Sequence, residues 1–202
     1  MSQTVHDAKG RATPHYYEAG PLVQLSKHIC VVGHRGARTD AVVRYLGALL
    51  GLHYVILDDA VAHTLGQSSL SFIGREGLNV YRHIEASTLR TLVKRRPYGL
   101  IACSSDTLSG WWTRTTVRQL SQTVWLDTDR RRLIDNARKD QRLYPGLPAF
   151  IIPDRFEAHC EASWDGGNAK VTVPVHSSTP SLIARDVMKY MGWSDVKADY
   201  GK

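Results

Sequence analysis

The residues best suited to chemistry form a glycine-bearing loop that joins a short apolar run to a helical pattern. In that context, successive backbone N–H groups and the N-terminus of a helix form a cradle for phosphate. The complete phosphate-binding pattern, GxxxxGK[ST], ends in glycine, lysine and a hydroxyl residue, whereas this chain has Arg38, Thr39 and Asp40 at those positions. We therefore interpret the loop as a vestigial phosphate loop, made of Gly33, Gly36, Ala37, Arg38, Thr39 and Asp40.

Each of the three substitutions removes a feature that phosphoryl transfer requires. Thr39 lacks the positive charge that a lysine places on the β- and γ-phosphates, and Asp40 replaces the hydroxyl that ligates magnesium with a carboxylate. Arg38 adds a bulky side chain where glycine allows close backbone approach, although its guanidinium would supply part of the missing charge. The loop therefore offers no clear catalytic residue.

The elements around this loop are predicted from apolar runs and helical periodicity. Strands are expected at 29–32, 54–57, 99–103 and 123–126, with an edge strand at 170–175, and helices over about 42–50, 80–93 and 180–191. Strands that alternate with helices at this spacing imply a mostly parallel sheet covered by helices on both faces. The predicted class is α/β with three layers, in one domain over 26–195, between an N-terminal extension, 1–25, and a C-terminal tail, 196–202.

The first strand and the sequence Gly33-x-x-Gly36-Ala37 are similar to the start of shikimate kinases, whose short phosphate loop has the form GxxGxGK[ST]. The resemblance extends in order and spacing from about Leu25 to Met191. It implies a P-loop kinase-like fold and, for active members, ATP-dependent phosphoryl transfer to shikimate. Against that pattern, the present loop is a degenerate Walker A motif.

The resemblance also implies roles for residues outside the loop. Asp58 falls where the family holds an aspartate that binds shikimate hydroxyls, and Tyr81-Arg82-x-x-Glu85 resembles a signature whose arginine grips the substrate carboxylate. Arg142 corresponds to the neighbourhood of the lid arginine, and Arg155 to that of a later substrate arginine. From spacing alone, Arg82 and Glu85 equally suit a structural ion pair on one helix face.

Two further departures from the family pattern affect the expected site. Ile56 stands where the family usually has a metal-associated aspartate. Ser104, Ser105 and Asp106 replace three glycines that let the backbone approach the substrate, and Asp106 brings another negative charge towards an anionic ligand. These changes predict no cofactor, with ATP and magnesium expected only if the chain is an active kinase.

Composition bounds the partners and the compartment. The formal charge of +7 suits anionic partners such as RNA and would also suit a mitochondrial matrix protein. Three separated cysteines indicate a reducing compartment, so an intracellular location in the mitochondrial matrix or the cytoplasm is expected. No apolar run is long enough for a membrane span, and the nine histidines show no metal-ligand spacing. Trp111-Trp112 is expected to pack against the sheet, with an exposed contact for a partner as the alternative.

Three functions are compatible with these features. The favoured one is a catalytically inactive shikimate-kinase-like protein that serves as a structural or assembly subunit of a larger complex, with protein partners and a basic surface for RNA or another anionic partner. The second is an active or residual shikimate kinase that uses Arg38, Arg142, Asp58 and Arg82. The third is a regulatory domain that senses shikimate or quinate without phosphorylating it. The sequence leaves open whether the chain is an enzyme, and the damaged loop favours an inactive protein.

Overall fold

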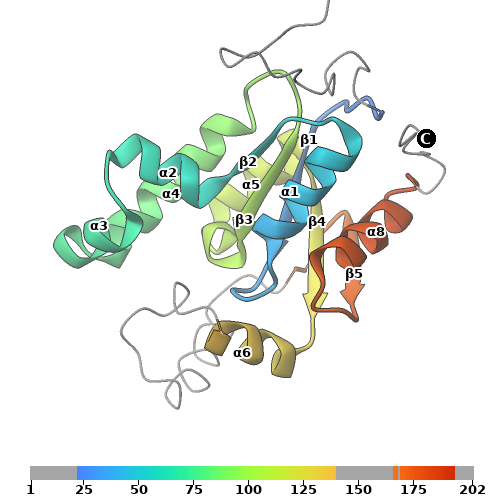
Figure 1. Ribbon diagram of the computed structural model, residues 1–202. Helices are drawn as coiled ribbons and strands as arrows, with labels where there is room; N and C mark the ends of the chain where they lie inside the picture. Colours follow the sequence, from blue (N-terminus) through green and yellow to red (C-terminus); the bar gives the residue numbers. More distant parts are fainter. Residues whose placement is uncertain (1–21, 140–165, 168, 194–202) are drawn as a thin grey trace, which may run out of the picture.

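A single parallel sheet organises the protein, whose computed structural model describes residues 22–139, 166–167 and 169–193 (Figure 1). The described strands lie in the order β2-β3-β1-β4-β5, and every neighbouring pair is parallel. Their bounds are β1 His28–Gly33, β2 Tyr54–Ile56, β3 Leu100–Ser104, β4 Ser121–Thr128 and β5 Val171–Val175. The strands therefore all end at the same edge of the sheet, which we call the carboxyl edge, opposite the amino edge.

One face of the sheet is covered by helices α1 (Thr39–Leu50) and α8 (Pro180–Tyr190). Ile29 and Val31 of β1 point into this core, where they join Leu46 of α1 and Val187 of α8. Helix α6 (Arg130–Lys139) lies at the carboxyl edge and adds Leu133 to the same core. The periodicity of α1 thus reflects the face that it buries.

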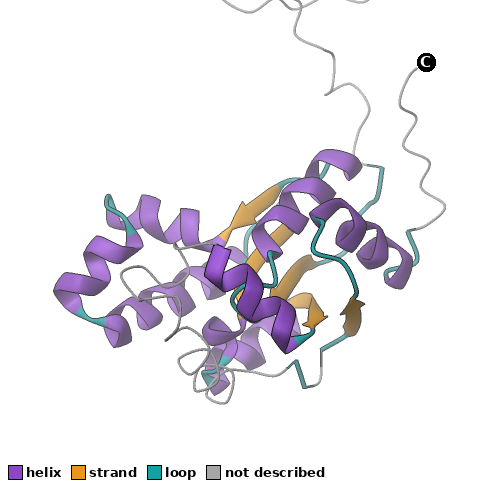
Figure 2. Ribbon diagram, turned by 60° about the horizontal axis from the view of Figure 1, so that its bottom comes forward, coloured by secondary structure: helices purple, strands orange, loops and turns teal. Residues whose placement is uncertain are grey.

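The other face of the sheet is covered by a second group of helices. These are α2 (Leu57–Leu65), α3 (Ser69–Glu76), α4 (Leu78–Leu92) and α5 (Trp111–Leu120), with a short 3-10 turn, η1 (Ser105–Leu108), after β3. Cys30 and Val32 of β1 point into this second core, because successive side chains of a strand face opposite ways. Figure 2 shows the strands enclosed by helices on both sides.

The predicted three-layer α/β class is confirmed, and the predicted strands and helices are all found. The second strand is shorter than expected, because Leu57 already begins α2 instead of extending β2. Cys30 and Cys103 are buried and free, as a reduced interior thiol should be. No helix among the described residues is long and apolar enough to cross a bilayer.

Candidate functional site

The vestigial phosphate loop lies at the carboxyl edge, between the end of β1 and the start of α1. Its glycines permit close packing: a Cβ on Gly33 would lie 2.7 Å from the Cβ of Ala37, and one on Gly36 would lie 2.7 Å from the carbonyl oxygen of Leu133. The N–H of Ala37 donates a hydrogen bond of 2.9 Å to the carbonyl of His34. The loop therefore has a tight turn, although it lacks the lysine and the hydroxyl residue of the family pattern.

Arg38 adopts a backbone conformation that suits glycine far better. Its φ of 61° and ψ of 34° are left-handed, and no other described non-glycine residue has a positive φ. A side chain in this region costs on the order of 1 kcal/mol. Arg38 is also the N-cap residue of α1, and it provides no side-chain cap to the first turn.

A cavity of about 610 Å³ opens beside the loop and collects groups from several elements. The loop contributes Arg38, Thr39 and Asp40, of which Asp40 is in the first turn of α1. The remaining walls come from the ends of β2 and β3, the start of α2 and helix α6, and include Ile56, Asp58, Asp59, Ser104, Asn136 and Lys139. The cavity thus has a threonine where the family pattern places a lysine, and a carboxylate where it places a hydroxyl.

Helix α6 is fastened to the loop by one hydrogen bond: the side-chain amide of Asn136 donates to the carbonyl of Gly36 over 2.9 Å. This contact joins residues 100 positions apart, and it explains why the backbone of Leu133 crowds Gly36. Helix α6 is therefore a wall of the cavity, to which it contributes Asn136 and Lys139. Arg142 and Arg155, the predicted lid and substrate arginines, lie outside the described residues.

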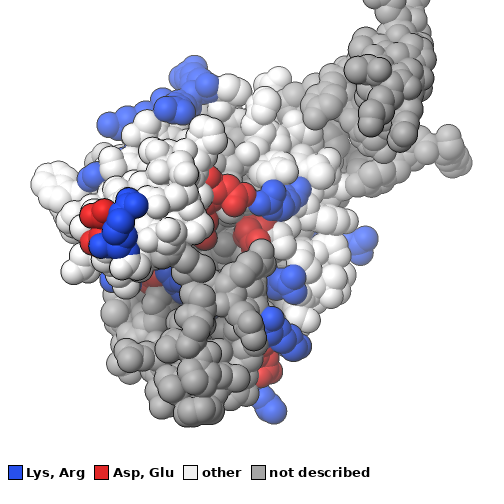
Figure 3. Space-filling model, turned by 60° about the vertical axis from the view of Figure 1, so that its left-hand side comes forward, with Lys and Arg blue, Asp and Glu red and all other residues white. Residues whose placement is uncertain are grey.

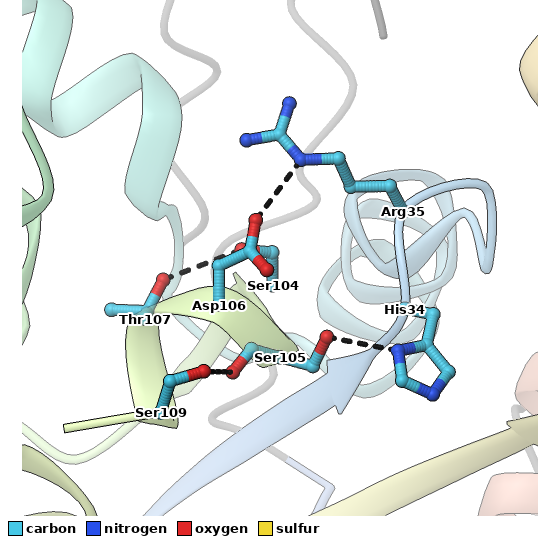
Figure 4. A network of polar contacts seen from close by, with 7 residues as sticks. All are labelled: His34, Arg35, Ser104, Ser105, Asp106, Thr107 and Ser109. Atoms are coloured by element: carbon cyan, nitrogen blue, oxygen red, sulfur yellow. Dashed lines mark hydrogen bonds and ion pairs between the residues drawn. The ribbon is translucent and has the colours of Figure 1, made fainter. Parts of the chain in front are cut away.

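Two loop side chains bind the turn that follows β3 (Figure 4). The Nε of Arg35 donates to a carboxylate oxygen of Asp106 over 3.1 Å, and the Nδ1 of His34 lies 3.1 Å from the hydroxyl oxygen of Ser105. The Asp106 side chain is 3% exposed and that of Arg35 is 30% exposed. These two contacts connect the phosphate loop to the 3-10 turn η1.

Arg35 lies among three carboxylates, those of Asp106, Glu85 and Asp58. Burial on its own would lower the pKa of Arg35, but these charges raise it above its usual value. Burial, followed by the charge of Asp58, raises the pKa of Glu85 to about 7. Burial also raises the pKa of Asp58, which Arg35 only partly offsets. An anion added beside Arg35 would therefore compete with three carboxyl groups that already surround this guanidinium.

Arg82 lies on α4 as the signature predicts, half-buried, and its Nε is buried without a hydrogen-bond partner among the described residues. No described ion pair joins it to Glu85, so the structural pair suggested by their spacing is absent from this part of the chain. The side-chain hydrogen bond of Glu85 goes instead to Thr107. The arginine that would grip a substrate carboxylate thus has one unused donor.

Sequence reasoning did not identify Arg35 and His34 as site residues. Both occupy the variable positions of the phosphate-loop pattern, and their partners Asp106 and Ser105 are 71 residues away. A charged residue at such a position was the only local signal. The second omission is Arg44, whose guanidinium contacts Asp59 at the mouth of the cavity over 2.7 Å, in an exposed pair.

The comparisons with known proteins agree on one family. The shikimate kinase family model matches residues 36–164, which is more than half of the chain. A shikimate kinase from Streptococcus thermophilus is 24% identical over 162 residues, covering 77% of this chain and 94% of the relative.

Solved structures show the same fold. Shikimate kinase from Acinetobacter baumannii in complex with shikimate superposes with a TM-score of 0.73 at 18% identity, covering 86% of this chain and 97% of that one. Shikimate kinase from Bacteroides thetaiotaomicron gives 0.69 at 12% identity, covering 82% and 98%. With the family model matched from Gly36 through α4 and β4, this chain belongs to the shikimate kinase family.

Proposed function

We propose that this protein is a catalytically inactive member of its family that serves as a structural or assembly subunit of a larger complex. The observation that carries the proposal is the position of Asp40, a carboxylate in the first turn of α1 that lines the cavity beside the phosphate loop. A carboxylate stabilises a helix N-terminus by itself, because the helix dipole is positive there. In the first turn of α1, the charge of Asp40 interacts favourably with the helix dipole and would repel a phosphate bound at the same place.

The size of this opposition favours loss of nucleotide binding. Two like unit charges about 4 Å apart repel by about 4 kcal/mol at an effective dielectric constant of about 20. A penalty of that size corresponds to a loss of about a thousandfold in affinity. The repulsion is local to Asp40, beside which Thr39 offers no cation. Elsewhere the cavity wall carries charges of both signs, from Asp58, Asp59, Arg35, Arg38, Arg44 and Lys139.

The residues at the magnesium position do not fit the metal that the family uses. Ile56 is 8% exposed, and its side chain has no oxygen ligand to offer. No group of three acidic, histidine or cysteine residues among the described residues is placed to hold a metal ion. We therefore propose no magnesium- or ATP-dependent reaction for this chain.

Calorimetric titration with ATP and magnesium, with and without shikimate, followed by a coupled turnover assay, tests this proposal. We expect no binding heat and no turnover. A triple variant, Arg38→Gly, Thr39→Lys and Asp40→Ser, rebuilds the loop pattern and should gain magnesium-dependent ATP binding; the Streptococcus thermophilus shikimate kinase is the positive control. Micromolar ATP binding with turnover by the unchanged protein would make it an active kinase instead and would refute the proposal.

A role as a subunit requires partners, and two features support it. The hydrophobic frame is complete on both faces of the sheet although the loop has degenerated. The charge of +7 suits an assembly with anionic components in the mitochondrial matrix or the cytoplasm. Cell fractionation followed by size-exclusion chromatography of the native extract should find the protein in a particle much larger than the monomer. Elution as a free monomer would contradict the subunit role.

A second candidate is a domain that binds a small hydroxy acid without phosphorylating it. The unused, buried Nε of Arg82 favours it, because a buried donor without a partner carries an energetic penalty that a ligand carboxylate would relieve. Titration with shikimate and with quinate in the absence of nucleotide tests this function. Binding that is lost in Arg82→Gln would support it, whereas no heat with either compound would leave only the structural role.

A further inference from the structure

Helix α5 carries an aromatic and basic stripe along its outer face. Trp111, Arg114 and Arg118 are three and four residues apart and therefore lie on one side of the helix. Trp111 and Trp112 are 58% and 71% exposed, and their rings meet edge-to-face with centroids 4.5 Å apart. We call Trp111, Trp112, Arg114 and Arg118 the α5 stripe. The sequence-based expectation that the tryptophans pack against the sheet is wrong, because α5 buries Thr113 and Val117 instead.

The stripe leads to a group of cations at the amino edge of the sheet. The ammonium of Lys27 donates to the carbonyl of Gln119, the residue after Arg118, over 2.9 Å. The next residue, His28, lies 2.8 Å through its Nε2 from the carbonyl of Arg95. These contacts bring three chain segments together. Their exposed cations, Lys27, Lys94, Arg95 and Arg96, are here called the amino-edge cluster.

In the described part of the chain, these cations form no ion pair. The sequence has no Asp or Glu between Glu85 and Asp106, or between Asp106 and Asp127, so neither the segment before β3 nor α5 supplies one. The described ion pairs involve Arg35, Arg44 and Arg75 and none of these residues. Figure 3 shows Lys and Arg atoms gathered at the top of the molecule without Asp or Glu atoms among them, whereas acidic atoms gather near the middle of that face.

We propose that the α5 stripe and the amino-edge cluster together bind single-stranded nucleic acid. Cations along a track neutralise successive phosphates, and exposed indoles provide surfaces on which unpaired bases stack. The ten residues of α5 span about 15 Å, enough for a short single-stranded segment between the tryptophans and the cluster. A duplex keeps its base faces stacked inside and would leave the tryptophans unused.

Two other anionic partners fit the observations less well. A membrane surface would require a broader apolar face, but on α5 Leu120 alone joins the two tryptophans as a large exposed apolar residue. The other described residues of this kind are on different elements, such as Leu182 and Tyr190 on α8. An acidic protein would satisfy the cations and cover the tryptophans, but single-stranded nucleic acid carries an anion beside every ring that can stack. The inference is independent of the catalytic state of the family site, because no residue of the stripe or cluster lines the cavity.

Fluorescence anisotropy with the full-length protein and a labelled 20-nucleotide single-stranded RNA tests the proposal, with DNA of the same sequence and the matching duplex alongside. We expect micromolar affinity at about 50 mM salt, weaker binding of the duplex, and a steep decline as salt rises. RNA and DNA binding both support the site, and their ratio tells which is preferred. Absence of binding to either single strand at low salt would overturn it.

Matched variants separate this surface from general attraction to a basic protein. Trp112→Ala should weaken single-strand binding roughly tenfold by loss of stacking, while Tyr190→Ala, a similarly exposed aromatic on α8, should have no effect. Arg95→Gln with Lys94→Gln should reduce both the affinity and the salt dependence, whereas Lys189→Gln with Arg185→Gln should change them much less. Equal effects of the two charge pairs, or binding to polyglutamate or anionic vesicles that exceeds binding to RNA, would overturn the proposal.

Discussion

The two edges of the sheet differ in whether their cations are paired with carboxylates of the same chain. At the carboxyl edge, Asp58, Glu85 and Asp106 surround Arg35, so this cation has its countercharges inside the protein. At the amino edge, Lys27, Lys94, Arg95 and Arg96 have no described ion-pair partner. The comparison shows that Arg35, at the edge with the phosphate loop, finds its countercharges within the protein. The cations at the opposite edge form no described ion pair and are available to an external anion.

Helix geometry accounts for part of this difference but not all of it. Helices α4 and α5 end at the amino edge, where a helix dipole favours cations such as Arg90 and Arg118 in the last turns. Lys27, Arg95 and Arg96 lie outside these helices, so the dipole gives no reason for their charge. The cations outside the helices are the ones that point to an external partner.

The largest expected effect concerns Glu85, the most deeply buried carboxylate of the carboxyl edge. Its pKa of about 7 is above the usual value of 4.5, so the folded state holds its proton more tightly than the unfolded state. Stability should therefore fall as pH rises from about 4.5 to 7, by up to about 3 kcal/mol, and change no further from this group above pH 7. Urea unfolding across pH 5–8 measures this.

The matched variant is Glu85→Gln, which removes the titrating group and should be more stable than the unchanged protein at pH 8. The difference between the two curves isolates Glu85 from other groups. A difference that stays constant between pH 5 and 8 would show that Glu85 titrates normally.

The second effect concerns the Arg35–Asp106 pair. Replacing Asp106 with Asn leaves the partly buried guanidinium of Arg35 without its nearest countercharge. The change should cost about 2 kcal/mol of unfolding free energy, below the roughly 3–5 kcal/mol of a fully buried pair, because Arg35 is 30% exposed. Chemical denaturation measures the loss. The double variant Arg35→Met, Asp106→Asn should recover much of it; a double variant as unstable as the single one would mean that Asp106 acts through other contacts.

A smaller effect is expected at Arg38, whose left-handed backbone conformation is unfavourable for a side chain. Arg38→Gly should stabilise the protein by up to about 1 kcal/mol, because relief of strain exceeds the added entropy of glycine in the unfolded chain. Thermal unfolding of this variant beside Arg38→Ala, which keeps the Cβ, measures the backbone contribution. Equal melting temperatures for the two would show that the conformation carries no strain.

The smallest effect is predicted at the amino edge. Lys94→Gln with Arg95→Gln should change the unfolding free energy by less than about 0.5 kcal/mol, because both side chains are exposed and in no described ion pair. Denaturation at low and high salt measures this. A loss above 1 kcal/mol would make these cations structural and would weaken the contrast between the two edges.

Local pattern was enough to predict most of the elements. The first strand, the glycine turn and α1 follow from an apolar run, two glycines and a helical repeat within about twenty residues. Helices α2, α3 and α5 were not assigned, since α3 and α5 have short or weakly apolar faces and α2 begins directly where β2 ends. The tryptophans of α5 were misplaced because their type favours burial, although the small Thr113 faces the core.

The sequence by itself determined which strands and helices follow one another along the chain, and it showed the family resemblance. It also showed that the phosphate loop lacks the lysine and the hydroxyl, because each of these features depends on residues close together in the chain. Tertiary structure alone decided that Arg35 pairs with Asp106 across 71 residues, that Arg82 is not paired with Glu85, and that cations of three segments meet at one edge. Such contacts depend on strand order and on which helix face is buried. The sequence therefore gives the charge of each residue, whereas the fold decides which group of opposite charge, if any, lies beside it.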